Sequence, residues 1–352
     1  MTLNKALTLN KIMTIALLTT LLTACGSGGG SSPVTQVPDT TVPDPVPTPD
    51  PTPDPPPDPT PDPAPTNDAC GILSAGDTCI SLEFPADSGL FRHYILRLPI
   101  PASPGITTDD TPKPLLIAFH GAGWHANAFH ELYHLGTFAD NHNYITLIPE
   151  STFRPEDGSK RWNTSNAVDR IPNVDDVGFT LAMIEQISTD YAVDMSSINL
   201  FGWSNGGFMS SRMACEYPEL ISGIFTFGGN IRHSVSQCST AGSVAISYLH
   251  GTSDSTVPYN GSLSGYIASP DATHQWAEKN ACTLDPQVRE SYNFSLGIAG
   301  DETDLVEYHD CVAPVQHVKV NGGSHGPSQY NFILFHQVMA DFYLSAKPGN
   351  RK

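Results

Sequence analysis

The chain has few basic residues. It carries only 17 Lys and Arg against 36 Asp and Glu, which gives a formal net charge of −19 over 352 residues. Proteins that bind nucleic acid neutralise phosphates with Lys and Arg, so an acidic chain repels such a partner. The same repulsion acts at anionic lipid surfaces. We therefore expect no nucleic-acid partner and no direct electrostatic binding to a membrane.

Long hydrophobic runs are also scarce. The apolar stretch 12–22, which follows Lys5 and Lys11, is too short to span a bilayer comfortably. Together with Leu22-Thr23-Ala24-Cys25 it resembles the signal of a bacterial lipoprotein precursor. That resemblance implies a signal peptide over 1–24, cleavage before Cys25, a lipid on its sulfur and, with Gly26 next, the outer membrane, facing the periplasm or the cell exterior. An ordinary signal peptide with a chance cysteine is the alternative.

Residues 25–68 lack the pattern of a hydrophobic core. A Gly/Ser stretch is followed by alternation of proline with Asp, Thr and Val, and 15 of the 31 prolines fall here. Such a segment favours extended polyproline II and behaves as a spacer. We expect 25–68 to be a disordered, lipid-anchored linker, with the membrane contacted through the lipid only, and 69–352 to be one large α/β domain.

No two cysteines have the C-x-x-C spacing of a metal site or redox motif. Apart from Cys25, six cysteines are left to pair, and export makes disulfides plausible. Sequence alone allows fifteen pairings, of which the nearest-neighbour set is Cys70–Cys79, Cys215–Cys238 and Cys282–Cys311.

The pattern of apolar residues predicts a doubly wound α/β sheet. Helical spacing separates most of the later strands, which are short and nearly all apolar, as in a parallel sheet covered on both faces. The first two strands are expected to pair antiparallel with each other at the start of the domain. Eight strands are expected, over 80–84, 91–98, 115–120, 144–149, 198–201, 223–227, 244–250 and 315–320. Helices are expected over 127–141, 177–191, 207–217, 272–279 and 329–344.

Gly202-Trp203-Ser204-Asn205-Gly206 lies between a predicted strand and a predicted helix. A serine on such a sharp strand-to-helix turn, with glycines around it, is typical of a hydrolase nucleophile. Gly322-Gly323-Ser324-His325-Gly326 fits the same pattern. If Ser324 were the nucleophile, the downstream histidines would be the adjacent His325 and His336 in the last helix, which is poor geometry.

An acyl-transfer serine needs a base and an acid that orients the base. Asp254 follows the seventh predicted strand and His325 follows the eighth, so Ser204, Asp254 and His325 have the chain order of the α/β-hydrolase arrangement. All three follow carboxyl ends of parallel strands, where open α/β sheets place ligands. By position, His309, His317 and His274 compete for the base and Asp271 for the acid.

The third predicted strand ends in His120-Gly121-Ala122-Gly123-Trp124. We expect the backbone N–H groups of Ala122 and Asn205 to form the oxyanion hole, since donors there stabilise the tetrahedral intermediate. His120 is expected to be structural. Trp124, Trp203 and Trp162 are candidate substrate-binding residues, with core packing as the alternative.

Several further motifs occur in order with this elbow. The set resembles the polyhydroxybutyrate depolymerase and feruloyl esterase group of α/β hydrolases over most of 70–345. The resemblance implies a secreted carboxylic-ester hydrolase with the triad Ser204, Asp254 and His325 and disulfides like Cys215–Cys238 and Cys282–Cys311. The motifs are Trp162-Asn163, Asp175-Asp176-Val177-Gly178-Phe179, Gly-Trp-Ser-Asn-Gly-Gly, His250-Gly251-Thr252 with Val257-Pro258-Tyr259, Trp276 with Asn280, and Gly322-Gly323-Ser324-His325. Ala122-Gly123-Trp124 and Gly326-Pro327 depart from the group's pattern beside the site, which leaves the substrate open.

A rival reading comes from His130-Glu131-Leu132-Tyr133-His134, which fits the zinc-protease pattern of two histidines one helical turn apart. Asp140 or His142 would supply a third ligand. Two weaker alternatives are a serine peptidase of the prolyl-oligopeptidase type and a noncatalytic adhesin on the same fold.

The preferred reading is a monomeric serine esterase that needs no cofactor and no metal. Only residues 228–243 separate the sixth and seventh strands, so little or no lid is expected over the site. An open cleft suits bulky or polymer-attached esters. The expected substrates are feruloyl or acetyl esters of polysaccharides, or short polyesters of the polyhydroxybutyrate or aromatic type.

Overall fold

The computed structural model describes residues 67–84, 90–100, 111–154, 158–165, 174–262, 265–326 and 330–350. They belong to one compact unit over 61–352. The predicted signal peptide, the lipid site at Cys25 and the linker up to residue 66 lie outside this part of the chain and stay predictions, which labelled fatty acid on Cys25 would test. Among the described helices, none has both the length and the hydropathy needed to cross a bilayer.

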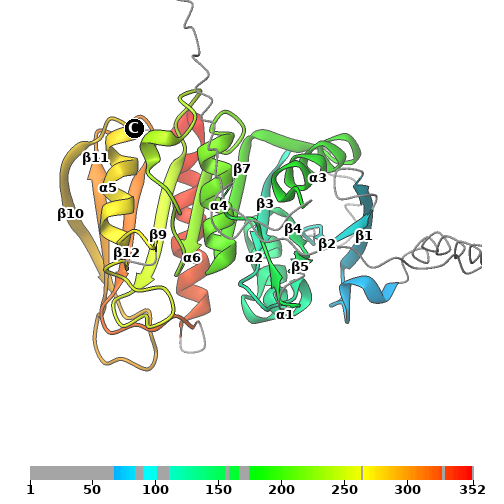
Figure 1. Cartoon of the computed structure of the whole chain (residues 1–352), viewed down its shortest axis with the longest axis horizontal. Coiled ribbons are helices and arrows are strands. Elements are labelled where there is room, and N and C mark those ends of the chain that lie inside the picture. The colour runs from blue at the N-terminus through cyan, green and yellow to red at the C-terminus, as the bar shows by residue number, and fades with distance from the viewer. Residues whose placement is uncertain are drawn as a thin grey trace, which may run out of the picture. The chain divides into compact units, whose positions relative to one another are not determined.

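A ten-stranded sheet forms the centre of the unit (Figure 1). Six adjacent strands, β4, β3, β7, β8, β9 and β12, run parallel, and antiparallel pairs extend both edges. The order across the sheet is β1 (Asp77–Phe84), β2 (Leu90–Arg97), β4 (Ile145–Pro149), β3 (Lys113–Phe119), β7 (Val193–Trp203), β8 (Gly223–Phe227), β9 (Ala245–Gly251), β12 (Val315–Val320), β11 (Thr303–His309) and β10 (Thr283–Tyr292). A separate two-stranded sheet joins β5 (Thr152–Phe153) to β6 (Lys160–Arg161).

The prediction of eight strands is wrong by one hairpin. The eight predicted strands are all present and adjacent, and β10 and β11 add two more at the β12 edge. β10 is exposed along nearly its whole length and contains Pro286, so it shows no buried apolar pattern. The Cys282–Cys311 disulfide closes the hairpin at its base.

Helices cover both faces of the sheet (Figure 1). Along β3, Leu115, Ile117 and Phe119 lie in one apolar cluster, and Leu116 and Ala118 lie in the other. Burial on both faces explains the nearly continuous apolar runs of the parallel strands. The first cluster holds α3 (Asp176–Asp190), α4 (Asn205–Glu216) and α5 (Ser269–Lys279); the second holds α1 (Ala126–Leu132), α2 (Leu135–His142) and α6 (Phe332–Ala346). The described residues also form three short 3-10 turns, η1 (Asn67–Cys70), η3 (Val235–Gln237) and η4 (Pro348–Asn350).

The prediction of a single helix over 127–141 is also wrong. The segment is split into α1 and α2 at His134, whose φ of 50° is left-handed. The His336 ring in α6 donates to the Tyr133 carbonyl oxygen at 2.8 Å. A distant element thus satisfies this carbonyl group at the break between the two helices.

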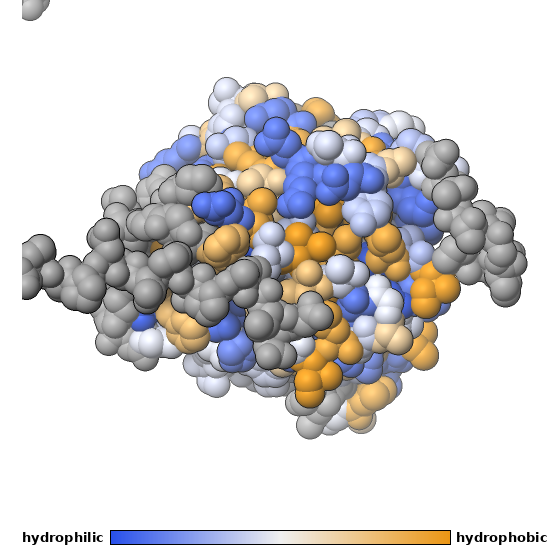
Figure 2. All heavy atoms as spheres, turned by 90° about the vertical axis from the view of Figure 1, so that its right-hand side faces the viewer, coloured by the Kyte–Doolittle hydropathy of each residue, from blue (hydrophilic) through white to orange (hydrophobic). Residues whose placement is uncertain are grey.

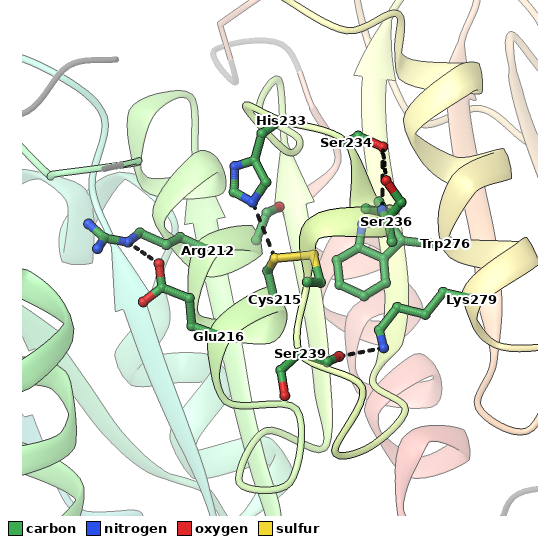
Figure 3. The surroundings of a disulfide bond; sticks show 12 residues. Arg212, Cys215, Glu216, His233, Ser234, Ser236, Ser239, Trp276 and Lys279 are labelled. Atoms are coloured by element: carbon green, nitrogen blue, oxygen red, sulfur yellow. Dashed lines mark hydrogen bonds and ion pairs between the residues drawn. A yellow bond between two sulfur atoms is a disulfide. The ribbon is translucent and has the colours of Figure 1, made fainter. Parts of the chain in front are cut away.

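All three nearest-neighbour disulfides are present. Cys215–Cys238 joins the last turn of α4 to the residue after η3, and His233 Nε2 lies 3.3 Å from Cys215 Sγ (Figure 3). Ser239, the residue after Cys238, is also held: its carbonyl oxygen accepts from Lys279 of α5 at 2.7 Å. The helix that follows Ser204 is therefore held covalently at its far end.

Figure 2 looks at the side of the unit that carries β1. Its coloured residues form several separate hydrophobic groups between hydrophilic ones. A large continuous apolar area would mark a binding face. The expected monomeric state stays a prediction.

Two buried histidines make stability depend on pH. Burial lowers the pKa of His317 to about 3, with charge from His250 and Lys319 acting in the same direction, and burial lowers the pKa of His336 to about 4. Both stay neutral in the folded protein but take up a proton in the unfolded chain below about pH 6.5. Their contribution to stability is therefore present above pH 6.5 and is lost as the pH falls.

We expect the free energy of unfolding to fall by about 2 kcal/mol for each of these histidines between pH 6.5 and pH 5. Urea denaturation at the two pH values measures this. His317→Gln is expected to remove about half of the combined loss, because Gln does not titrate. Replacement of the partly exposed His274 by Gln is the control. An unchanged loss in His317→Gln would contradict the assignment.

Candidate active site

Ser204 lies on a sharp turn between β7 and α4. Its φ of 54° and ψ of −118° are strained for a residue with a side chain. A Cβ on Gly206 would overlap the carbonyl oxygen of Phe119, and one on Gly202 would overlap that of Gly206. Only glycine fits at these two positions, so the sequence motif allows β7, α4 and β3 to approach closely enough to form the turn.

The structure brings His325 and Asp254 to Ser204. His325 Nε2 lies 2.9 Å from Ser204 Oγ, and His325 Nδ1 lies 2.6 Å from Asp254 Oδ2. A carboxylate only accepts, so Nδ1 carries the proton and donates to Asp254, and Nε2 accepts from the Ser204 hydroxyl. Parallel pairing of β9 with β12 places the loops that carry Asp254 and His325 side by side. These distances are those of a Ser-His-Asp triad.

Asp254 is held as an ionised acceptor. Its Oδ1 accepts the backbone N–H groups of Thr256 and Val257, each at 2.8 Å, and its side chain is fully buried. Burial raises the pKa of the carboxyl group, but hydrogen bonds from His250 and His325, the charge of His325 and the N–H of Val257 lower it by more. The resulting pKa is well below the ordinary value, so Asp254 is charged when His325 takes a proton.

His250 is a residue of this site that sequence reasoning missed. Its Nε2 lies 3.1 Å from Asp254 Oδ2 and 2.9 Å from the Val257 carbonyl oxygen. Both partners accept, so Nε2 carries the proton and donates to both. Its position at the end of β9, four residues before Asp254, was the available signal.

The competing residues lie in other surroundings. His317 contacts Tyr259 and Thr273, and the His274 ring lies beside Tyr308. Asp271 is exposed in the first turn of α5. Exposed His309 ends β11, and exposed Ser324 precedes His325 in the loop. Within the described residues, the Ser204 hydroxyl is hydrogen-bonded to His325 and to none of these competitors.

The predicted oxyanion donors flank the elbow. A Cβ on Gly121 would lie 2.9 Å from the Trp203 ring, so the turn that carries Ala122 packs against the residue before Ser204. Asn205 is the first residue of α4, and its side chain accepts the N–H of Trp162 at 2.7 Å. The backbone N–H groups of Ala122 and Asn205 donate to no other described residue. Their role as oxyanion donors stays a proposal.

The three tryptophans differ in exposure. Trp162 is fully buried and its Nε1 donates to the His120 carbonyl oxygen at 2.9 Å, so its prediction as a substrate-binding residue is wrong. Trp203 is 7% exposed and its Nε1 donates to the His325 carbonyl oxygen at 3.0 Å. Trp124 is half-buried with its ring edge-on to Trp203. Of the three, Trp124 offers the most surface to a substrate.

The zinc-protease arrangement is not formed. His130 lies in α1, while His134 precedes the first residue of α2 and packs its ring against Phe332. His130 Nε2 instead lies 3.0 Å from Asp77 Oδ2. Among the described residues, the metal-capable group here is Asp77, His130 and Glu131, without His134. The split helix removes the spacing on which the motif depends.

The chain resembles known esterases in sequence and structure. Residues 106–266 match a family model described as phospholipase/carboxylesterase. A solved acetyl xylan esterase from Aspergillus awamori superposes with a TM-score of 0.52 at 13% identity, covering 75% of this chain and 99% of that one. The chain has the α/β-hydrolase fold.

Two curated relatives of this chain are feruloyl esterases by name. Feruloyl esterase B of Piromyces equi is 25% identical over 229 residues, 62% of this chain and 40% of the relative. Probable feruloyl esterase C of Aspergillus flavus is 27% identical over 153 residues, 43% of this chain and 50% of the relative. The chain spans half or less of the length of these relatives.

Proposed function

We propose that this α/β hydrolase is a serine carboxylic-ester hydrolase that acts through an acyl-enzyme. The observation that carries the proposal is the hydrogen-bonded series from Ser204 Oγ through His325 to Asp254 at 2.9 and 2.6 Å, on a strained elbow. This geometry activates a hydroxyl as a nucleophile.

In the first step, Ser204 Oγ attacks the ester carbonyl carbon while His325 Nε2 takes the hydroxyl proton. The charge that develops on the carbonyl oxygen is stabilised by the N–H groups of Ala122 and Asn205. His325 then donates its proton to the leaving alcohol oxygen, and Asp254 stabilises the imidazolium throughout. Water, deprotonated by His325, then attacks the acyl carbon, the bond from this carbon to Ser204 Oγ breaks, and His325 returns the proton to Ser204 Oγ as the carboxylic acid leaves.

The proposed substrates are feruloyl or acetyl esters of polysaccharides. Support comes from the names of the relatives, which include feruloyl esterases and a bifunctional acetylxylan esterase/xylanase of Neocallimastix patriciarum. The segment between β8 and β9 contains only the short η3, so no cap domain is inserted there. Half-buried Trp124 beside Trp203 suits an aromatic acyl group. Short polyesters of the hydroxybutyrate or aromatic type are the second candidate class.

The test combines inhibitors with an ester panel. We expect a fluorophosphonate to abolish hydrolysis by labelling Ser204, and a chelator to have no effect. Methyl ferulate and p-nitrophenyl acetate are expected to be cleaved at least about tenfold faster than a p-nitrophenyl ester of a long fatty acid, because the segment between β8 and β9 forms no cap domain that would shield a long acyl chain. Hydroxybutyrate oligomers, an aromatic polyester and a prolyl p-nitroanilide complete the panel.

Each arm separates one alternative. Chelator sensitivity without fluorophosphonate labelling would exclude the serine mechanism. Cleavage restricted to the anilide would indicate a peptidase, and cleavage restricted to polyesters would move the substrate to the second class. Preference for long acyl chains would contradict the open site.

A further inference from the structure

The turn with the proposed donor Ala122 is fixed by residues outside the triad. We name residues 120–126, between β3 and α1, the oxyanion loop. Of the described residues in this loop, Gly123 has a positive φ of 74°, and both glycines lack side chains that would pack. A loop with two glycines has many conformations, so its position depends on external contacts.

Both ends of the oxyanion loop are held by the segment that follows β4. At the first end, the Ser151 N–H donates to His120 Nε2 at 3.1 Å. At the second end, the Ala126 N–H donates to Glu150 Oε2 at 3.0 Å. Two adjacent residues of one strand end therefore fix the loop where it begins and where it ends.

The middle of the loop is held by the hairpin of β5 and β6. The Gly123 N–H, next to Ala122, donates to the Lys160 carbonyl oxygen at 2.8 Å. The Lys160 ammonium lies 3.2 Å from Glu150 Oε1, and both side chains are about nine-tenths buried, with exposed fractions of 13% and 12%. This ion pair joins the two segments that hold the loop.

The charge on Glu150 is maintained by its neighbours. Burial raises the pKa of its carboxyl group, but the Lys160 ammonium and the N–H of Ala126 oppose this effect, and the pKa lies below the ordinary value. His125 also faces this group, with Nδ1 3.7 Å from Glu150 Oε2 and 3.0 Å from Lys160 Nζ. A buried, ionised carboxylate with a cation partner makes stronger contacts than a surface pair.

We propose that Glu150 and Lys160 are positioning residues that hold the Ala122 N–H where the oxyanion forms. This inference rests on the proposed serine hydrolase function. Glu150 touches neither the triad nor the reacting atoms, and it acts through the loop. Since the oxyanion exists only after attack, loss of this support is expected to weaken binding of the transition state and to leave binding of the ester nearly unchanged.

The experiment compares Glu150→Ala, Glu150→Gln and Lys160→Met with wild type, using p-nitrophenyl acetate and counting active sites by the final extent of fluorophosphonate labelling. Complete loss of one oxyanion donor lowers kcat by about 10²- to 10³-fold. In Glu150→Ala the donor is retained but misplaced, so kcat is expected to fall by about 30-fold. KM is expected to change less than about twofold. Glu150→Gln keeps an oxygen for Ala126 and is expected to stay within about fivefold of wild type, with Lys160→Met between the two.

A second readout is phenylboronic acid, which forms a tetrahedral adduct on the serine oxygen. Its inhibition constant is expected to rise by about the same factor as kcat falls. The matched control is Asp194→Asn, which breaks the 2.7 Å pair with Lys347 at the start of β7, at the opposite end of this strand from Ser204. This variant is expected to keep the wild-type kcat.

The proposal is overturned if kcat per labelled site in Glu150→Ala stays within twofold of wild type. It is equally overturned if KM rises as much as kcat falls. The same holds if the lower activity of Glu150→Ala is explained entirely by a smaller fraction of protein that the fluorophosphonate labels. If wild-type protein cleaves no ester, the proposed function fails by itself, and the rate of Ser204 labelling still measures the effect of Glu150 on the oxyanion loop.

Discussion

Replacing Ser204 by alanine is expected to lower kcat by about 10⁵- to 10⁶-fold, because no other group supplies the attacking oxygen. His325 Nε2, 2.9 Å from Ser204 Oγ, then has no hydroxyl proton to accept. The measurement is single-turnover hydrolysis of p-nitrophenyl acetate after separation from any wild-type contaminant. Ser324→Ala, in the other glycine-rich pentapeptide, is the control and is expected to keep full activity. Loss of activity in Ser324→Ala alone would reverse the assignment of the nucleophile.

The same position is expected to separate stability from activity. At φ 54° and ψ −118° a Cβ strains the backbone, and glycine has no Cβ. Ser204→Gly is therefore expected to be as inactive as Ser204→Ala but more stable by about 1 kcal/mol in urea denaturation. Equal stability of the two variants would show that the turn stores no strain that a Cβ adds.

Replacing Asp254 by asparagine is expected to lower kcat by about 10⁴-fold. The Thr256 and Val257 N–H groups hold an oxygen at the Oδ1 position, so the new amide nitrogen faces His325. That nitrogen donates to His325 Nδ1 and forces the proton onto Nε2, which then cannot accept from Ser204. The matched control is Asp271→Asn, the other acid considered from the sequence, which is expected to leave kcat unchanged.

Asp254→Asn is also expected to destabilise the fold. The amide nitrogen meets the N–H of His250, which lies 3.1 Å from Asp254 Oδ2, so two donors face each other in a buried site. An unsatisfied buried donor costs about 1–3 kcal/mol. Thermal unfolding and pre-steady-state kinetics on the same preparation separate this loss from the chemical one. An active Asp254→Asn variant with normal kcat would remove Asp254 from the mechanism.

The sequence predicts local structure correctly at positions that only one residue type can occupy. Gly202 and Gly206 mark the elbow because any side chain there overlaps backbone, and that steric limit is visible in sequence. The parallel strands were readable since both their faces are buried, which leaves nearly continuous apolar runs. Chain order then placed Asp254 and His325 correctly beside Ser204 in the fold.

Structural features that depend on partners distant in the chain could not be predicted from the sequence. The break at His134 lies where a ring from α6 bonds the Tyr133 carbonyl oxygen, 203 residues away from it in sequence. Trp162 was predicted to bind substrate, yet it is buried and its Nε1 donates to the His120 carbonyl oxygen. The β10 and β11 hairpin has an exposed, polar strand that carries no core pattern.

By itself, the sequence determined the fold class, the elbow at Ser204 and the order of the three triad residues, because these depend on local sterics and on which faces are buried. Tertiary structure alone decided which side chains support them. His250 beside Asp254 and Glu150 beside the oxyanion loop are polar residues without a periodic pattern. The partner of Glu150, the N–H of Ala126, comes from another segment 24 residues away, and the ring of His250 meets Asp254 only because the loop after β9 folds back. A hydrogen bond between distant segments depends on angstrom-scale placement, which periodicity along the chain does not encode.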